Sequence, residues 1–296
     1  MSEERDKKNV SGNKIDEVTG IETTGHTWDG IEELNNPLPR WWLWTFYATI
    51  LWGLIYVIAY PAWPLISGAT AGVMGWSSRG TVAAEIVAHE LRNEDLVNAL
   101  EQVEMASLTE NEDLNRYAVA RGAAVFRAHC SQCHGSGAAG AKGYPNLLDD
   151  DWLWGGDMDT IVHTVRHGIR NDTDPDAHYS EMPAFGEILG DEEISQVVEY
   201  VLSLSDEDHD AALAEAGTQV YMDNCSACHG ENAEGDRAQG APNLADAIWL
   251  YGGDRDTLTE TVTYSRYGVM PAWGQRLSEA DVRAASAYVH GLGGGE

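Results

Sequence analysis

Basic residues and cysteines are scarce in this chain. Its 296 residues include 18 lysines and arginines against 48 aspartates and glutamates, for a formal net charge of −30, and only four cysteines. This charge argues against nucleic-acid binding, because phosphates would be repelled. It favours basic partners, whose encounter rates it would raise, although a solvated acidic surface that only keeps the protein soluble explains the composition equally well.

All the cysteines lie in two copies of one motif. Residues 130–134 read CSQCH and residues 225–229 read CSACH, and C-x-x-C-H is the attachment motif of c-type haem. In this motif two thiols bond the porphyrin vinyl groups, and the following histidine faces the iron. We therefore predict two covalently bound haem c groups, held by the thiols of Cys130, Cys133, Cys225 and Cys228.

Two other uses of C-x-x-C pairs fit less well. A structural zinc site usually joins pairs about 15–20 residues apart, whereas these pairs are much farther apart and each is followed by a histidine. A thioredoxin-like pair should sit near a βαβ pattern, and the sequence shows none. Covalent haem is the interpretation that uses both histidines.

Only one uncharged stretch is long enough to cross a membrane. Residues 41–60 carry no charge, and twenty helical residues span about 30 Å, the thickness of the hydrocarbon core. A buried core helix and a cleaved signal peptide fit less well, because the run is uninterrupted, begins forty residues into the chain and exceeds the roughly 7–15 residues of a signal sequence. We predict a transmembrane helix over residues 41–61. Aromatic residues mark its two ends, as in interfacial belts: Trp41, Trp42 and Trp44, then Tyr56, Tyr60 and Trp63.

The segments beside this helix have different compositions. Residues 1–40 are polar and mostly predicted to be disordered, and Pro37 and Pro39 exclude a helix in the last part, which is suited to packing on a partner at the membrane surface. Residues 62–108 are expected to form an interface loop and then a connecting helix from Thr81, broken near Asn93. Basic residues near the N-terminus, and haem attachment outside the cytoplasmic membrane, predict a cytoplasmic N-terminus and periplasmic haem domains.

The rest of the chain is a tandem repeat. Each copy has an amphipathic helix, the C-x-x-C-H motif, a Pro-Asn-Leu turn, a Gly-Gly-Asp motif, a short helix, a Met-Pro-Ala-aromatic-Gly motif and a closing helix. Two copies of about 90 residues predict two domains, residues 109–205 and residues 206–296. The first copy is nine residues longer between its Gly-Gly-Asp motif and its methionine.

Each repeat supplies two candidate axial ligands for iron. His134 and His229 follow the cysteine pairs, and Met182 and Met270 stand before prolines that stiffen the loops. Histidine with methionine is the axial set of cytochromes c, and the soft thioether raises the reduction potential. Pairing within a repeat is the simplest arrangement, but the sequence leaves open an exchange of methionines between the two domains.

Other residues have supporting or competing roles. His163, His167 and His178 are alternative iron ligands for the first repeat, although satisfied or exposed histidines are more common. The carbonyls of Pro145 and Pro242 are positioned to accept the imidazole N–H of the proximal histidines. Further expectations concern haem walls at Trp152, Trp154, Trp249 and Tyr251, propionate partners or helix caps at Arg166 and Arg266, helix packing at Tyr117 and Tyr221, and gap-filling cores at Met74, Met105, Met158 and Met222.

With these residues in view, the chain resembles the dihaem subunit of cbb3-type cytochrome c oxidases along nearly its whole length. The part of the sequence most specific to this family is residues 29–42 (DGIEELNNPLPRWW). It leads into the single hydrophobic helix and the segment YPAWP at residues 60–64. The cytochrome motifs alone are generic. The resemblance implies an all-α fold, with one N-terminal transmembrane helix followed by two tandem class I c-type cytochrome domains.

The resemblance also implies a function and partners. Members of that family accept electrons from a donor cytochrome c, here expected to be basic, and pass them to a monohaem subunit and then to the catalytic subunit, where oxygen is reduced and protons are pumped. This chain has no histidine set suited to copper, so oxygen chemistry would occur elsewhere. The alternatives are a cytochrome subunit of a periplasmic dehydrogenase, which differs only in partner, and a dihaem peroxidase-like enzyme, which needs a five-coordinate iron.

Overall fold

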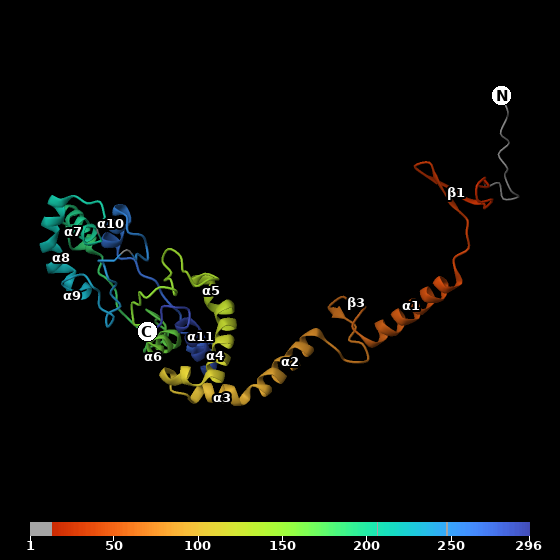
Figure 1. The fold of residues 1–296 in the computed structure, drawn as a ribbon, viewed down its shortest axis with the longest axis horizontal. Helices are drawn as coiled ribbons and strands as arrows, with labels where there is room; N and C mark the ends of the chain where they lie inside the picture. Colours follow the sequence, from red (N-terminus) through yellow and green to blue (C-terminus); the bar gives the residue numbers. More distant parts are fainter. Residues whose placement is uncertain (1–13, 206, 247) are drawn as a thin grey trace, which may run out of the picture. The chain divides into compact units, whose positions relative to one another are not determined.

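The fold is described from a computed structural model, in which residues 14–205, 207–246 and 248–296 are placed well enough to describe. The chain forms two compact units, divided between Glu90 and Leu91. Helices account for most of the ordered backbone, and the strands are short (Figure 1). The two units are described separately.

The first unit opens with a β-hairpin that the sequence analysis did not predict. β1 (Thr23–Trp28) and β2 (Ile31–Leu34) pair antiparallel, with Trp28 opposite Ile31. Asp29 and Gly30 form the turn, with φ of 50° and 83°. Positive φ at both central residues is the type I′ geometry that matches strand twist, and Asp-Gly is one of its preferred sequences. The hairpin lies almost entirely within residues 24–39, the part that the sequence analysis set apart from the disordered segment, although no strand was predicted there.

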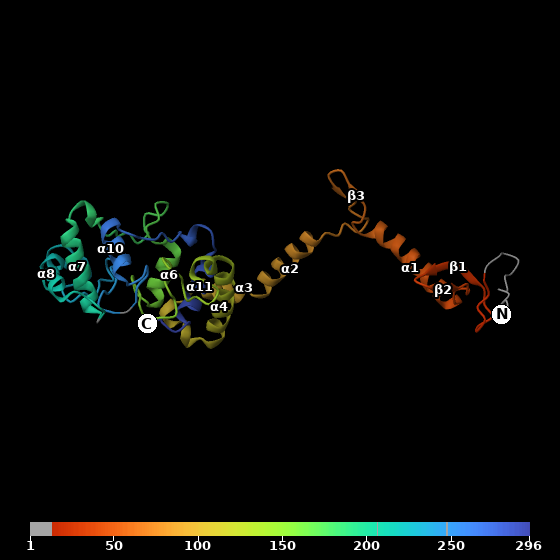
Figure 2. The ribbon, with the colours of Figure 1, turned by 90° about the horizontal axis from the view of Figure 1, so that it is seen from above.

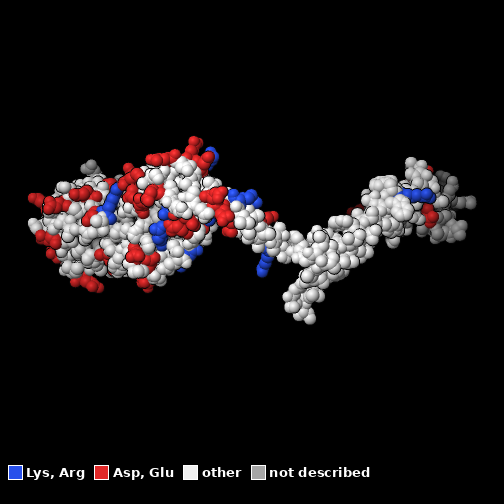
Figure 3. Space-filling model, turned by 90° about the horizontal axis from the view of Figure 1, so that it is seen from below, with Lys and Arg blue, Asp and Glu red and all other residues white. Residues whose placement is uncertain are grey.

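The hydrophobic stretch forms a single helix, α1 (Arg40–Ala59), which is long and apolar enough to cross a membrane. It begins directly after Pro39 and ends before Pro61, as proline geometry favours. None of its residues is buried within the chain, so its apolar surface is available to lipid or protein. Figure 3 shows this stretch as a surface without charged side chains.

A second small hairpin follows α1. β3 (Pro64–Leu65) pairs with β4 (Gly68–Ala69), and the Thr70 hydroxyl accepts a hydrogen bond from the Trp63 amide. The chain then returns to the end of α1, where the amide of Val73 donates to the Ile58 carbonyl at 3.0 Å. This is the segment expected as an interface loop, and it leads into α2 (Ser78–Arg92).

The second unit is helical throughout. The helix break predicted near Asn93 is confirmed, because Asn93 separates α2 from α3 (Glu94–Gln102). The remaining elements, in order, are η1 (Met105–Glu110), α4 (Glu112–Val125), the π-helical turn η2 (Phe126–Cys130), α5 (Ser131–His134), α6 (Met158–His167), η3 (Phe185–Glu187), α7 (Asp191–Leu204), α8 (Ala211–Asn224), α9 (Ser226–His229), α10 (Arg255–Tyr264), η4 (Trp273–Gln275) and α11 (Glu279–His290).

The helices pack across the two sequence repeats. α4, the first helix of the first repeat, packs on α11, the last helix of the second, and α6 contacts η4 and α11. In the same way α7 of the first repeat packs on α8 of the second, and α10 contacts η3 and α7. Figures 1 and 2 both place α4, α6 and α11 together and α7, α8 and α10 together.

Each group has its own hydrophobic core. Module A, as we call it, consists of residues 94–168 and 270–292, and its core includes Leu108, Phe126, Ile161 and Val282. Module B consists of residues 185–264, and its core includes Ile194, Val198, Tyr221 and Leu258. Module B is therefore one continuous stretch of sequence, and it is inserted between the two sequence segments that form module A.

A glycine allows the closest helix contact in each module. A Cβ on Gly122 of α4 would lie 1.9 Å from the Ala284 carbonyl oxygen of α11. A Cβ on Gly217 of α8 would lie 2.0 Å from the Gln196 carbonyl oxygen of α7. Both distances are far below contact, so only glycine permits these backbones to approach so closely. The two modules thus use the same kind of helix crossing. In module A the first helix of repeat one meets the last helix of repeat two, and in module B the last helix of repeat one meets the first helix of repeat two.

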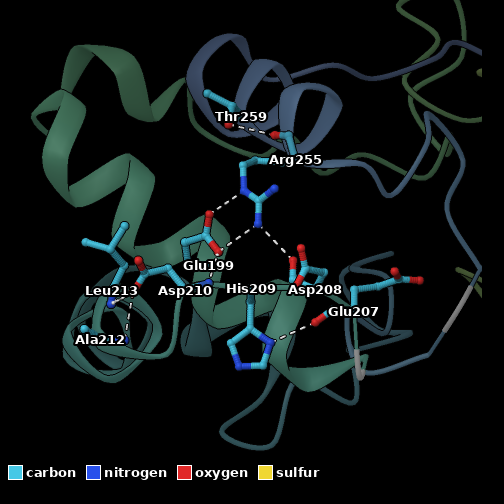
Figure 4. Close-up of polar contacts among 9 residues, drawn as sticks. All are labelled: Glu199, Glu207, Asp208, His209, Asp210, Ala212, Leu213, Arg255 and Thr259. Carbon is cyan, nitrogen blue, oxygen red and sulfur yellow. Dashed lines mark hydrogen bonds and ion pairs between the residues drawn. The ribbon is translucent and has the colours of Figure 1, made fainter.

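Module B also contains a buried ion pair, drawn in Figure 4. Glu199 of α7 is 4% exposed, and its carboxylate accepts a hydrogen bond from Arg255 of α10 at 3.1 Å. The same carboxylate accepts from the Asp210 amide at 2.7 Å, and Arg255 donates to the Asp208 carbonyl at 2.9 Å. The pair thereby joins α7, α10 and the start of α8, where the Asp210 side chain caps the helix by accepting from the Leu213 amide.

The methionines expected to fill core gaps divide into two kinds. Met105 and Met158 are buried in module A, as predicted. Met74 and Met222 are 64% and 38% exposed, so the prediction was wrong for them. Met222 lies on the outer face of α8, and Met74 lies in the uncharged segment after α1.

Candidate haem sites

Both cysteine motifs form a short helical turn that presents the histidine. α5 ends at His134 and α9 at His229, and the next residues, Gly135 and Gly230, have φ of 79° and 83°. This conformation is costly for residues with a Cβ, so glycine ends each turn abruptly. The chain then reverses under the histidine ring.

The reversal brings a proline carbonyl to each proximal histidine. His134 Nδ1 lies 3.1 Å from the Pro145 carbonyl oxygen, and His229 Nδ1 lies 2.9 Å from that of Pro242. The predicted hydrogen bonds are therefore confirmed. With the proton on Nδ1, each ring donates a hydrogen bond to its proline carbonyl, and Nε2 is left free to coordinate a metal.

Burial favours the neutral form of both histidines. It lowers the pKa of His134 and of His229, and the hydrogen bonds to the proline carbonyls oppose this only in part. A neutral imidazole is the form that coordinates a metal. The two rings are thus prepared as ligands by their own loops.

The thiols are paired and mostly inert. Cys130 and Cys225 are partly buried, and Cys133 and Cys228 are exposed, with no disulfide between them. Burial and the neighbouring thiol raise the pKa of Cys130 and of Cys225 to about 11. A raised pKa makes the reactive thiolate form of Cys130 and Cys225 less accessible. Two thiols, a neutral imidazole and a distant thioether fit the requirements of covalent haem c.

Met270 packs on the core of the module that contains the first cysteine motif, and the Met182 backbone is bonded next to α10, a helix of the module that contains the second. Met270 contacts the core of module A, which also contains Cys130. Its backbone pairs with Ile169 through two hydrogen bonds of 3.0 Å. The Met182 carbonyl accepts a hydrogen bond from the Ser265 hydroxyl at the end of α10, and the following turn η3 packs on α10 in module B.

Most aromatic residues predicted to line the haem sites lie near them, but in two different settings. Trp152 belongs to the core of module A and Trp249 to that of module B. Trp154 and Tyr251 instead reach across the modules. A Cβ on Gly240 would lie 2.3 Å from the Trp154 ring, and one on Gly143 would lie 3.2 Å from the Tyr251 ring.

The arginines that both repeats carry, Arg166 and Arg266, have partners within the protein. Arg166 pairs with Glu279 of α11. Arg266 donates to the Thr257 carbonyl at 2.8 Å and stacks on Tyr251, with its guanidinium carbon 4.8 Å from the ring centroid. Tyr221 packs on Tyr200 of α7 and donates to the Gly230 carbonyl at 2.7 Å, while Tyr117 contacts Arg121 on the same helix. These residues hold helices and loops together.

Comparisons with known proteins agree with this geometry. The family model for the N-terminal domain of FixP, a cbb3 cytochrome oxidase, matches residues 20–67, and the model for subunit III of cbb3-type cytochrome c oxidase matches residues 117–201 and 212–289. The cbb3-type cytochrome c oxidase subunit CcoP of Cereibacter sphaeroides is 61% identical over 276 residues, which are 93% of this chain and 95% of that protein. The subunit FixP of Sinorhizobium medicae is 50% identical over 285 residues, 95% of this chain and 98% of the relative.

The chain belongs to the CcoP/FixP family of cbb3-type cytochrome c oxidase subunits. Membership confirms the resemblance, the predominantly helical fold with two tandem cytochrome regions, and haem c as the cofactor. It also agrees with α1 as a membrane anchor. The match over residues 20–67 shows that the unpredicted hairpin belongs to a region that the family model recognises.

Haem c supplies one-electron transfer between its ferric and ferrous states. The residues of this chain determine how such a group would be held. The cysteine thiols would form its covalent bonds, the loop prolines fix the proximal imidazoles, and the packed methionine loops would supply the sixth donor. If a histidine and a methionine both bound the iron, no position on it would remain open for a substrate.

Proposed function

We propose that the chain carries two haem c groups and passes electrons from a donor cytochrome c to the monohaem and catalytic subunits of a cbb3-type oxidase. The observation that carries this proposal is the duplicated histidine site. In each copy, a hydrogen bond to a proline carbonyl orients the histidine of the C-x-x-C-H motif. Family membership supports the partner subunits, since the relatives are named as parts of that oxidase.

The test of partnership is purification of the anchored protein under mild detergent, followed by metal analysis. Copper and non-covalent haem that co-purify in fixed ratio to the chain would support the oxidase. Association with a copper-free dehydrogenase would refute it. Carbon monoxide binding to the reduced, intact chain would instead indicate an open iron and a peroxidase-like enzyme.

Iron ligation is proposed to cross the two repeats. His134 and Met270 would serve the haem on Cys130 and Cys133, because Met270 packs in the core of module A. His229 and Met182 would serve the haem on Cys225 and Cys228, because the Met182 backbone is bound to the end of α10 in module B. No histidine other than the proximal pair is needed in this arrangement.

The domain and membrane arrangement follows from the same reasoning. Residues 1–40 would lie in the cytoplasm, residues 41–61 in the inner membrane, residues 62–108 at and beyond its outer surface, and the two cytochrome repeats in the periplasm. Haem attachment outside the cytoplasmic membrane supports this orientation. Protease added to intact spheroplasts should remove the haem-bearing part and spare the N-terminal segment, and the reverse pattern would refute the orientation.

The acidic surface suits a basic electron donor. Acidic side chains are spread over the second unit (Figure 3), and the chain as a whole carries 30 more acidic than basic residues. Complementary charge raises association rates, and salt screens the effect. The reduction rate by a cationic cytochrome c should fall steeply with ionic strength, whereas an anionic donor should show the opposite trend.

A further inference from the structure

The extra residues of the first repeat include several aspartates and a histidine whose role is not yet explained. Between the Gly-Gly-Asp motif and the methionine this repeat is nine residues longer than the second, and the longer segment reads RNDTDPDAHYSE over residues 170–181. Within this segment every second residue from 172 to 176 is an aspartate, and His178 follows two residues later. None of these residues has a role in the haem sites described above.

The insertion folds back onto the end of α6. The amide of His178 donates to the Gly168 carbonyl at 3.1 Å, and the Arg170 amide donates to the His178 carbonyl at 2.7 Å. The His178 ring then stacks on that of His163, with centroids 4.6 Å apart, and on Trp154 at 4.3 Å. The insertion is therefore a fixed part of module A's surface and is held by its backbone.

This fold places two carboxylates beside two histidines of α6. His163 and His167 lie one helical turn apart, with ring centroids 4.7 Å from each other. His167 Nδ1 lies 3.2 Å from both carboxylate oxygens of Asp174, whose side chain is only 13% exposed. One ligand atom each from His167, Asp174 and Asp176 can be chosen so that all lie within 4.8 Å of one another.

His163, one turn before His167, has a buried ring nitrogen that no described group of the protein uses. Its buried Nδ1 has no hydrogen-bond partner within the described part of the chain. Burial and the charges of His167 and Arg166 lower the pKa of His163, while Asp176 and Asp174 act in the opposite direction, so both carboxylates lie within electrostatic reach of the ring. A buried imidazole nitrogen without a partner is costly unless something binds it.

Module B has nothing comparable at the same positions. Counted from Asp157 and Asp254, the residues of α10 that correspond to His163 and His167 are Glu260 and Tyr264. Glu260 is already paired with Arg266, and the Tyr264 side chain is exposed. Because the two repeats are otherwise built alike, the histidine pair and the insertion that meets it form a feature added to one repeat only.

We propose that His167, Asp174 and Asp176, with His163 as a further donor, bind a divalent first-row transition-metal ion outside the haem sites. Histidine nitrogens and carboxylate oxygens are ligands typical of zinc, which takes three or four protein donors. A set of imidazoles on adjacent helical turns faced by carboxylates from a loop also suits the neighbouring metals of the series. The simpler explanation, an isolated His167–Asp174 ion pair, gives no role to Asp176 or to the unpartnered nitrogen of His163.

Zinc is a suitable probe because it is redox-inactive and colourless beside haem. The full-length, haem-loaded chain would be stripped with a chelator, dialysed against buffered Zn²⁺, and assayed for zinc and iron by mass spectrometry. We expect one zinc per chain, and at least tenfold weaker binding in the double variant Asp174→Asn, Asp176→Asn. The matched control, Asp172→Asn with Glu181→Gln, removes two charges from the same insertion and should bind zinc as the unaltered chain does.

Three outcomes would overturn the proposal. The first is no more zinc on the unaltered chain than on the double variant, and the second is equal weakening in the matched control, which would indicate nonspecific attraction to acids. The third is a change in the haem absorption spectrum when zinc binds, because the cluster would then belong to an iron site.

A measurement on the unaltered chain covers the case in which the variant does not fold. Modification of histidines by diethyl pyrocarbonate, mapped by mass spectrometry, should be slowed at His167 by Zn²⁺. The exposed His26 and His209 should react at the same rate with or without zinc. Equal reactivity of His167 in both conditions would refute the site.

Discussion

Ile169 and Met270 lie 101 positions apart in the sequence and bond to each other as a pair of antiparallel residues. Each donates its amide to the carbonyl of the other at 3.0 Å. Ile169 follows α6 of the first repeat, and Met270 begins the Met-Pro-Ala motif of the second. This pair holds the methionine loop of the second repeat on the segment that follows α6 in the first.

The exchange of methionines can be tested with chains that carry one haem. In a chain with Cys225→Ser and Cys228→Ser, the haem bound at Cys130 and Cys133 remains. Met270→Ala in that chain should convert the iron from low spin to high spin, because the sixth ligand is lost, and Met182→Ala should leave it low spin. Visible absorption and electron paramagnetic resonance spectra distinguish the two states.

The complementary chain provides the control for this experiment. With Cys130→Ser and Cys133→Ser, the effects of the two methionine substitutions should be reversed. If Met182→Ala alone produced high-spin iron in the first chain, ligation would follow the sequence repeats and the crossed assignment would be wrong.

The close helix crossings predict a strong effect of small substitutions. Gly122→Ala places a methyl group against the Ala284 backbone, and Gly217→Ala places one against that of Gln196. Because a backbone cannot move aside as a side chain can, each change should cost about 3 kcal/mol of unfolding free energy, at the upper end of overpacking effects. Denaturant unfolding of the haem-loaded chain measures this.

Gly137→Ala is the matched control for the helix crossings. A Cβ at Gly137 meets nothing within 4 Å, so the substitution should change the stability little. If Gly122→Ala were tolerated equally well, α4 and α11 could not approach as closely as described.

The Glu199–Arg255 pair predicts unequal effects of its two partners. Arg255→Ala leaves the Glu199 carboxylate buried without its counter-charge and should lower the unfolding free energy of module B, by less than for a fully buried pair because the Arg255 side chain is 47% exposed. Glu199→Gln keeps an acceptor for the Asp210 amide and should cost less. Thermal or urea midpoints at pH 7 give the order, and a larger loss for Glu199→Gln would contradict it.

The same pair predicts how stability depends on pH. The hydrogen bond from Arg255 holds the pKa of Glu199 below its ordinary value, with burial acting against it. A carboxyl group whose pKa is lowered by folding stabilises the protein above its unfolded pKa, about 4.3, and loses that contribution as the pH falls through the folded pKa. The stability difference between the unaltered chain and Arg255→Ala should therefore shrink below pH 4. A constant difference down to pH 2 would exclude this origin.

The anchor can be tested with a single charge. Ile50 lies at the middle of α1, and its side chain is exposed, like most of the helix. Ile50→Arg should weaken membrane insertion by about 2.5–3.5 kcal/mol, and more of the chain should appear in the soluble fraction. Val18→Arg, a comparable change at an exposed position before the helix, should leave the membrane fraction as it was.

The sequence was sufficient to predict local structure and ligands where the signal was local. The helix of residues 41–60, the break at Asn93 and the hydrogen bonds of Pro145 and Pro242 were all expected and found. Each depends on residues close together in the chain. The Asp29-Gly30 turn is also a local signal, and weighing its hairpin preference against the polar composition of residues 1–40 would have predicted β1 and β2.

The packing partners could not be predicted in this way. Both repeats carry the same helices and the same methionine motif, so α4 could close on α7 or on α11 with similar apolar faces. The choice depends on contacts such as Gly122 with Ala284, which involve residues about 160 positions apart. No periodicity within either repeat carries that information.

The nesting of module B inside module A has a consequence for biogenesis. In the proposed orientation, Cys130 and Cys133 would cross the membrane before the second cysteine pair, yet their module lacks α11 until synthesis is almost complete. Module B, by contrast, has all its helices once Tyr264 has been synthesised. A haem bound at the first pair would thus be the earlier one attached and the later one enclosed, and a nascent chain halted before Met270 would hold it without the residues that follow.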